Sequence, residues 1–176
     1  MKMRILTAAV GAAWLLAGAA SAQQPAAPPN LDAIPDKMPW ATPYGPSISA
    51  DRAQAAVAAA AAEAKKRGWA MNIAVAGPGG GLISFLKMDD AQLASISIAQ
   101  HKARVAAPFR RPTKVFEDAV QKGGLNYIMT LDDVIASRGG IPLIENDKLI
   151  GAIGCSGGTG SQDEVVCQVG AATVNK

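Results

Sequence analysis

The feature that most constrains the fold is the segment from residue 138 to residue 170. Two short apolar runs, residues 141–144 and 149–155, flank the polar and turn-prone residues 145–148. Two apolar runs separated by a short polar turn are typical of a β-hairpin. The segment therefore predicts two antiparallel strands, and a glycine-rich loop follows them directly.

That loop, residues 157–160, leads into a predicted helix. Ser161 and Glu164 fit a capping box, in which each side chain accepts a hydrogen bond from the backbone N–H of the other residue. Apolar residues then recur along one side of the predicted helix: Val165, Val166, Val169 and Ala172. The loop could bind an anion at the helix start or serve only as a flexible joint, and we favour the joint.

The N-terminus is predicted to direct export. Residues 1–22 combine two early basic residues, an apolar run and an A-x-A cleavage pattern, as in a secretory signal peptide. We expect a periplasmic or secreted protein with no stable membrane insertion after cleavage. Loss of Lys2 and Arg4 lowers the formal net charge from +3 to +1, so the basic composition does not point to nucleic acid.

Two further segments follow the signal peptide. Residues 23–46 hold seven of the eleven prolines, which predicts an extended arm or linker. We expect Trp40 and Tyr44 in this arm to be buried against the same subunit or a neighbouring one. Residues 47–176 are predicted to form a single domain.

The two cysteines, Cys155 and Cys167, are compatible with export. An even number of cysteines in an oxidising compartment permits a disulfide. The alternative is a pair of buried free thiols, and the sequence does not decide between the two. The spacing is not C-x-x-C, which argues against a redox-active pair.

The remaining elements complete an α+β pattern. An alanine-rich helix at 51–67, capped by Ser47 or Ser49, precedes strands at 69–76 and 82–87. Helices are predicted at 94–107 and 112–122, and residues 126–130 could form a short edge element. Hairpins without β-α-β crossovers predict a central antiparallel sheet built from two hairpins, with helices packed against it.

A basic segment is the main candidate binding site. Between Ala91 and Phe116 no residue is acidic, and Ile98, His101 and Val105 share one helix face. Basic side chains, a helix start and a hydroxyl favour binding of carboxylates. The candidate ligand-binding residues are His101, Lys102, Arg104, Phe109, Arg110, Arg111 and Thr113, and His101 is also the candidate metal ligand. A solvated basic face with a structural histidine is the plainer alternative.

Other catalytic patterns are incomplete. Residues 154–158 fit G-x-S-x-G, but the chain has no histidine after them to complete a hydrolase triad. One histidine and two separated cysteines do not supply an obvious zinc site. The sequence leaves open whether the protein is an enzyme.

The ordered motifs GPGGGLISFLKMDDAQLASISIAQHKARVAAPFRRPT, GGIPLI and IGAIGCSGGTGSQDEVVCQVGAA resemble the GlcG/HbpS-like haem-binding family over about residues 49–173. The resemblance implies an α+β domain, a homo-oligomer and a haem ligand, and some members of the family are reported to degrade haem. Where relatives often carry threonine, this chain has Val105. Many relatives have a non-ligating residue at the position of His101, so a histidine–iron bond is argued from this sequence alone.

The leading hypothesis is therefore an exported haem-binding protein, in which arginines contact the haem carboxylates and His101 binds the iron. A second hypothesis is an enzyme or accessory protein acting on a small hydroxy- or keto-acid, with His101 as general base. A third is a scaffold whose function is its oligomer.

Overall fold

The computed structural model describes residues 33–175, so the predicted signal peptide lies outside the described residues. The order of elements follows the prediction, with small shifts at the ends. The elements are α1 (Ala50–Lys66), β1 (Asn72–Ala76), β2 (Leu82–Lys87), α2 (Ser95–Ala106), α3 (Lys114–Gln121), the 3-10 helix η1 (Asn126–Thr130), β3 (Gly140–Glu145), β4 (Lys148–Ser156) and α4 (Gly160–Ala172).

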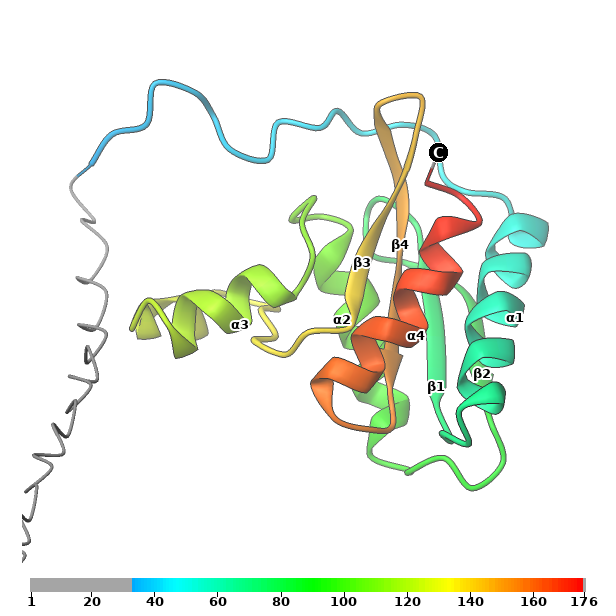
Figure 1. Cartoon of the computed structure of the whole chain (residues 1–176). Coiled ribbons are helices and arrows are strands. Elements are labelled where there is room, and N and C mark those ends of the chain that lie inside the picture. Colours follow the sequence, from blue (N-terminus) through cyan, green and yellow to red (C-terminus); the bar gives the residue numbers. More distant parts are fainter. Residues whose placement is uncertain (1–32, 176) are drawn as a thin grey trace, which may run out of the picture.

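The four strands form one sheet in the order β2-β1-β4-β3 (Figure 1). Both hairpins, β1–β2 and β3–β4, are antiparallel, and β1 also pairs antiparallel with β4. The two hairpins thus join through their inner strands. This arrangement confirms the predicted α+β fold with a central antiparallel sheet.

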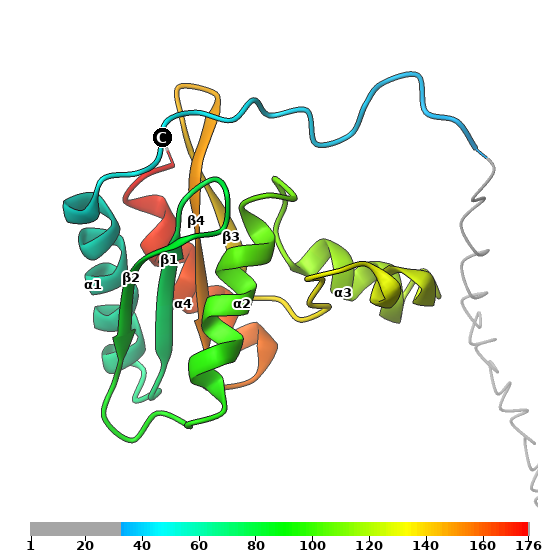
Figure 2. The same cartoon turned by 180° about the vertical axis from the view of Figure 1, so that it is seen from behind.

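Helices cover both faces of the sheet. In Figure 1, α1 and α4 lie on one face, while the reverse view in Figure 2 shows α2 on the other. Alternation along β1 explains these two layers: Ile73 and Val75 join the core beneath α1 and α4, whereas Ala74 and Ala76 pack towards α2. The small side chains on the second face let α2 approach the sheet closely.

At Gly154 in β4, α2 lies directly against the sheet. A Cβ atom there would lie 2.2 Å from the carbonyl oxygen of Ala99 and 2.5 Å from the backbone nitrogen of Ala103. The change Gly154→Ala must therefore move the helix and is expected to lower the free energy of unfolding by about 1–3 kcal/mol. Urea unfolding measures the loss. Gly79→Ala is the control, because nothing lies within 4 Å of a Cβ there; equal losses in both variants would contradict the prediction.

The start of α4 differs from the sequence prediction. The helix begins at Gly160, and its capping box uses Thr159 and Gln162 rather than Ser161 and Glu164. The prediction of a capping box at Ser161 was wrong because another pair of suitable residues lies two positions earlier. Glu164 instead lies 3.5 Å from a guanidinium nitrogen of Arg138.

Residues 126–130 also differ from the prediction. They form η1 rather than a short edge element of the sheet, and Ile128 packs with Val105 and Phe116 in a small apolar cluster beside α3. The sheet edge next to β4 is already taken by β3. Figure 1 shows α3 projecting to the side of the layered sheet, so this cluster forms a lobe separate from the main core.

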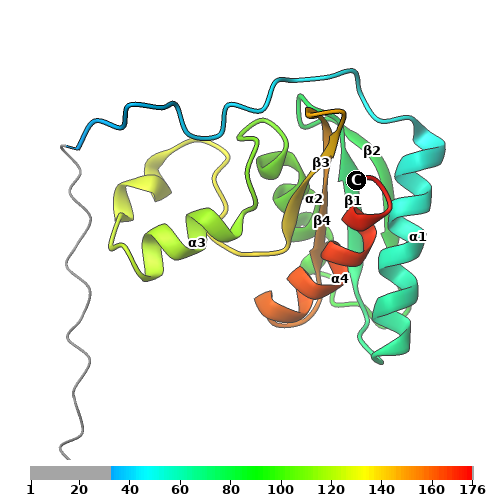
Figure 3. The same ribbon diagram turned by 45° about the horizontal axis from the view of Figure 1, so that its top comes forward.

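The C-terminal end of the arm is attached to the domain by hydrogen bonds. The backbone N–H of Gly45 donates to the carbonyl oxygen of Leu149, and that of Leu149 donates to Pro43. The arm thereby pairs with β4 beyond the end of β1. Figure 3 shows the chain passing above α3 and the β3–β4 turn on its way to α1.

Candidate functional site

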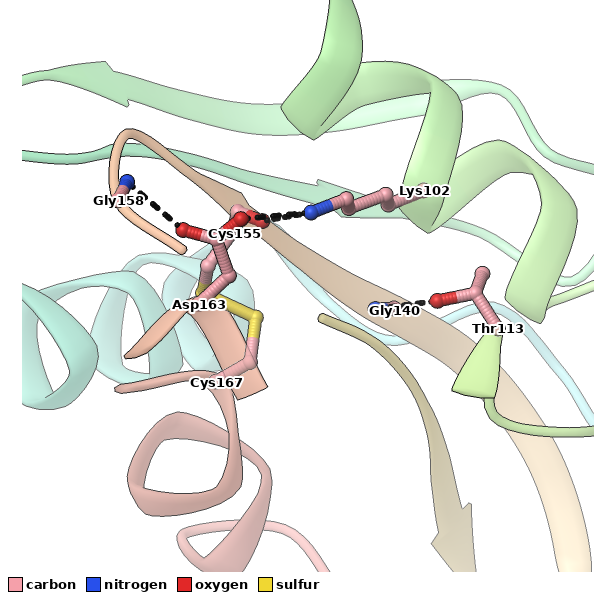
Figure 4. Close-up of a disulfide and its surroundings, with 7 residues drawn as sticks. All are labelled: Lys102, Thr113, Gly140, Cys155, Gly158, Asp163 and Cys167. Atoms are coloured by element: carbon pink, nitrogen blue, oxygen red, sulfur yellow. Dashed lines mark hydrogen bonds and ion pairs between the residues drawn. A yellow bond between two sulfur atoms is a disulfide. The ribbon is translucent and has the colours of Figure 1, made fainter. Parts of the chain in front are cut away.

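Lys102, one of the predicted ligand-binding residues, lies in the interior. Its Nζ donates to Asp163 Oδ2 at 2.7 Å and to the carbonyl oxygen of Cys155 at 3.2 Å. The Lys102 and Asp163 side chains are only 1% and 4% exposed. Figure 4 shows Lys102 reaching from α2 past the end of β4 towards α4. The pair joins helices on opposite faces of the sheet, so Lys102 does not face a ligand at the surface.

Asp163 is held on both of its oxygens. Its Oδ1 accepts the Gly158 N–H at 3.0 Å while Oδ2 accepts from Lys102. Burial raises the pKa of the Asp163 carboxyl above its usual value, and the charge and hydrogen bond of Lys102 oppose only part of that increase. The aspartate therefore shapes the glycine-rich loop, which supports the interpretation of the loop as a joint.

Next to this pair, Cys155 and Cys167 form a disulfide with their Cα atoms 5.6 Å apart. Of the two possibilities left open by the sequence, the structure has the disulfide. It ties the end of β4 to the second turn of α4. Both cysteines are fully buried.

Thr113, another predicted ligand-binding residue, is fully buried as well. Its hydroxyl accepts the Gly140 N–H at 2.9 Å, and its own N–H donates to the Gly140 carbonyl oxygen at 3.0 Å. These bonds fasten the start of β3 to the turn before α3. Thr113 and Lys102 thus make contacts that stabilise the fold, and neither belongs to an exposed surface.

His101 and Arg104 both contact Asp133, in the loop before β3. His101 Nε2 donates to the carbonyl oxygen of Asp133 at 2.9 Å, and Arg104 forms an exposed ion pair with the Asp133 carboxylate at 3.0 Å. With Nε2 protonated, the lone pair of a neutral imidazole is on Nδ1. Both residues hold the loop before β3 in place.

Phe109, Arg110 and Arg111 form the corner between α2 and α3. The Arg111 guanidinium lies 5.1 Å from the ring centre of Trp40 and 5.6 Å from that of Phe116. The Arg110 guanidinium lies 5.1 Å from the ring centre of Tyr44. The aromatic residues of the arm thus contact the predicted basic site.

The sequence predicted that Trp40 and Tyr44 are buried against the same subunit or a neighbouring one, and burial within this subunit was wrong. They are 38% and 52% exposed, although each ring lies against an arginine. Burial against a neighbouring subunit stays a prediction.

An apolar pocket opens beside this corner, between α3 and η1. Its volume is about 380 Å³, a size suited to a small ligand or to one edge of a larger one. Among the described residues, Arg111 contributes the only full charge to its walls. The lining residues are Phe109, Arg111, Val115, Phe116, Ala119, Leu125, Tyr127, Ile128 and Leu131.

The charge of the corner is not balanced. Within residues 33–175, neither Arg110 nor Arg111 forms an ion pair with a carboxylate. Burial and the adjacent charge of Arg110 lower the pKa of Arg111 from its usual value. A second, polar hollow of about 360 Å³ is lined by Arg52 and Glu145. There the arginine charge is balanced, because Arg52 forms an ion pair with Glu145 at 2.7 Å. The corner therefore resembles a site for an anion.

Sequence reasoning missed the pocket walls on α3 and η1, and it missed the contact between the arm and the arginines. One sequence signal could have revealed the pocket wall on α3. Val115, Phe116 and Ala119 recur at helical spacing on a short helix beside the basic corner, which indicates an apolar face there.

The described part of the chain shows neither a metal-binding cluster nor a membrane-spanning helix. No group of three or more His, Cys, Asp or Glu side chains is arranged to hold a metal ion there. No helix among those residues is both long and apolar enough to cross a membrane.

Residues 48–172 match the family model described as haem degrading protein HbpS-like. The chain belongs to the HbpS-like family. The motifs behind the resemblance are largely the structural contacts described above, since Lys102 pairs with Asp163 and Thr113 with Gly140. The family pattern in this HbpS-like domain therefore describes the fold more than the pocket.

Among known relatives, protein GlcG of Escherichia coli K12 is 40% identical over 109 residues, which cover 62% of this chain and 81% of GlcG. The crystal structure of a PduOC:haem complex has 28% identity and a TM-score of 0.66, covering 73% of this chain and 96% of PduOC. The crystal structure of HbpS has 25% identity and a TM-score of 0.68, covering 75% and 93%. One of these HbpS-like neighbours thus carries haem.

Proposed function

We propose that this protein binds haem at the pocket beside α3. The observation that carries the proposal is an apolar pocket whose one charged wall residue, Arg111, has no carboxylate partner within the described residues. Haem combines an apolar macrocycle with two carboxylates, and so needs apolar walls next to cations. The haem complex of the related PduOC supports the same ligand.

The residues of the pocket fit an edge of the macrocycle rather than the whole of it. Phe109, Phe116 and Ile128 offer apolar contacts, and Phe109 and Phe116 already pack edge to face with ring centres 5.2 Å apart. Arg110 and Arg111 would hold the propionates through charge-assisted hydrogen bonds. When bound, the haem iron would supply redox or ligand-binding chemistry.

Titration of the purified protein with hemin tests the proposal. We expect a saturable shift of the Soret band at micromolar hemin, because the apolar pocket and the arginines would bind complementary parts of the ligand. Absence of a saturable shift would refute haem binding. The same samples, followed with ascorbate in air, would reveal haem degradation as bleaching of the Soret band.

The variant His101→Ala tests the predicted iron ligand. If His101 binds the iron, the Soret maximum of the complex should move, because the axial ligand determines the electronic state of the iron. To bind the iron, His101 would have to use Nδ1, or use Nε2 after breaking its hydrogen bond to the Asp133 carbonyl oxygen. An unchanged Soret maximum together with lower stability would mean that the histidine only anchors the loop.

The second hypothesis, a small hydroxy- or keto-acid ligand, rests on the same two arginines. The apolar walls favour a ligand with a large apolar part, which such acids lack. A thermal-shift screen of small carboxylates against hemin separates the two ligands.

We further propose that the protein is exported and forms a homo-oligomer. The disulfide supports export, because such bonds persist in oxidising compartments. Exposed Leu82 and Leu86 on the edge strand β2 support an oligomer, because apolar sheet edges favour pairing with another chain. Light scattering measures the subunit number.

A further inference from the structure

The arm precedes the segment that the family model matches. The family match begins at residue 48, whereas the contacts of the arm with the arginine corner come from residues 40–44. These contacts join segments almost 70 positions apart, since Arg110 Nη1 donates to the carbonyl oxygen of Thr42 with a sequence separation of 68. The arm therefore contacts both arginines of the corner.

Arg111 makes cation–π contacts with two aromatic rings, Trp40 from the arm and Phe116 from α3. Its Nε–H donates to the Phe109 carbonyl oxygen at 3.0 Å. Such contacts use the charge of the guanidinium and leave its remaining N–H groups unused. Within the described residues those groups have no hydrogen-bond partner, so they are available to a carboxylate.

Arg110 is held by the arm in a similar manner. Its guanidinium lies against the Tyr44 ring and donates to Thr42, while the Tyr44 hydroxyl donates to the Pro108 carbonyl oxygen at 2.5 Å. Tyr44 is in turn fixed by its neighbours, because Pro43 and Gly45 hydrogen-bond with Leu149 of β4. The sheet thus sets the position of the arm, and the arm sets the position of Arg110.

The charges of two adjacent arginines repel each other, and the contacts with the arm oppose that repulsion. We infer that the arm is a positioning element: Trp40 and Tyr44 hold Arg111 and Arg110 together at the pocket mouth as a fork that recognises the carboxylates of a planar, amphipathic ligand. This inference rests on the proposed function, since haem belongs to that class of ligand.

The test compares hemin with hemin dimethyl ester, which has the same macrocycle but no carboxylates. Wild-type protein is expected to bind hemin more tightly than the ester by roughly tenfold or more, as charge-assisted hydrogen bonds would contribute only to the acid. Arg111→Met should remove most of this preference directly. Trp40→Ala should reduce it as well although its side chain carries no charge, and Trp40→Phe should restore it because a ring remains to stack on the guanidinium.

A matched control comes from a second arginine–tryptophan contact, at the C-terminal end of α1 and away from the arm. The Arg67 guanidinium lies 5.1 Å from the Trp69 ring centre, so Arg67→Met removes a similar contact away from the pocket. This variant should keep the wild-type preference for hemin. The effects of Trp40→Ala and Arg111→Met on the preference should not add. The double variant should bind hemin about as Arg111→Met does.

The outcomes separate the inference from the proposed function. If wild-type protein binds hemin and Trp40→Ala keeps the full preference over the ester, the inference is wrong and haem binding stands. If Trp40→Ala weakens the binding of hemin and of the ester equally, the arm only stabilises the structure, and the inference is again wrong.

If wild-type protein binds no hemin, the proposed function fails. The fork is then tested with pyrenebutyrate and its methyl ester, a smaller planar acid and its uncharged form, by pyrene fluorescence. A preference for the acid that Trp40→Ala abolishes would uphold the fork, whereas equal binding of acid and ester would refute it.

Discussion

Replacing Lys102 with methionine is expected to lower the free energy of unfolding by about 3–5 kcal/mol, because the change leaves the Asp163 carboxylate buried without its cation. Urea unfolding of the purified protein at neutral pH measures the loss. An exposed pair on the same helix supplies the control: Arg104→Met breaks the ion pair with Asp133 and should cost less than about 1 kcal/mol.

The double variant Lys102→Met, Asp163→Asn should lose less stability than Lys102→Met alone. It removes both charges and keeps an oxygen that can accept the Gly158 N–H, so no unpaired charge remains in the interior. A double variant less stable than the single one would show that the attraction between the two charges outweighs the cost of burying them.

The pH dependence of Lys102→Met follows from the raised pKa of Asp163. In wild-type protein this pKa already lies above the usual value, and loss of the cation should raise it further. A carboxyl whose pKa is higher in the folded state stabilises the fold below its unfolded pKa of about 3.9, and this contribution disappears as pH rises through the folded pKa. The variant should therefore come closest to wild-type stability in acid.

Removing the disulfide should have a similarly large effect. Cys155 and Cys167 are separated by 12 positions, and closing a loop of that length is expected to contribute about 3 kcal/mol by restricting the unfolded chain. Urea unfolding in the presence of a reductant, or of Cys167→Ala without one, should show this loss. The reductant should have no further effect on Cys167→Ala. Equal unfolding midpoints of wild-type protein with and without reductant would contradict the prediction.

The disulfide also illustrates a limit of sequence reasoning. The sequence placed Cys155 on a strand and Cys167 on the next helix, and both placements agree with the structure. It could not decide between a bridge and two free thiols, since that depends on how α4 packs back over β4. The bridge forms because this packing brings the two Cα atoms to 5.6 Å.

The candidate site shows the same division more strongly. The seven predicted ligand-binding residues lie within 13 positions of the sequence, which suggested one basic surface. The helical geometry of α2 separates the three that lie on it. Lys102 points inward to Asp163, whereas His101 and Arg104 point outward to Asp133. Of the predicted residues, Phe109 and Arg111 line the pocket, and Arg110 lies beside it.

By itself, the sequence determined the elements and their pairing. Hairpins, helices and buried strands arise from patterns within a few residues, such as the polar turn between β3 and β4 or the alanines of α1. These local preferences agree with one another, and for that reason the antiparallel sheet could be predicted without the structure.

Only the tertiary structure decided which charges are paired and which are open to a ligand. Lys102 meets its aspartate 61 positions away, and Arg110 meets the arm 68 positions away. The electrostatic environment of a side chain depends on groups a few ångströms away in space, which packing brings together from distant parts of the chain. The basic segment therefore separated into a buried structural lysine and an arginine corner without acidic partners.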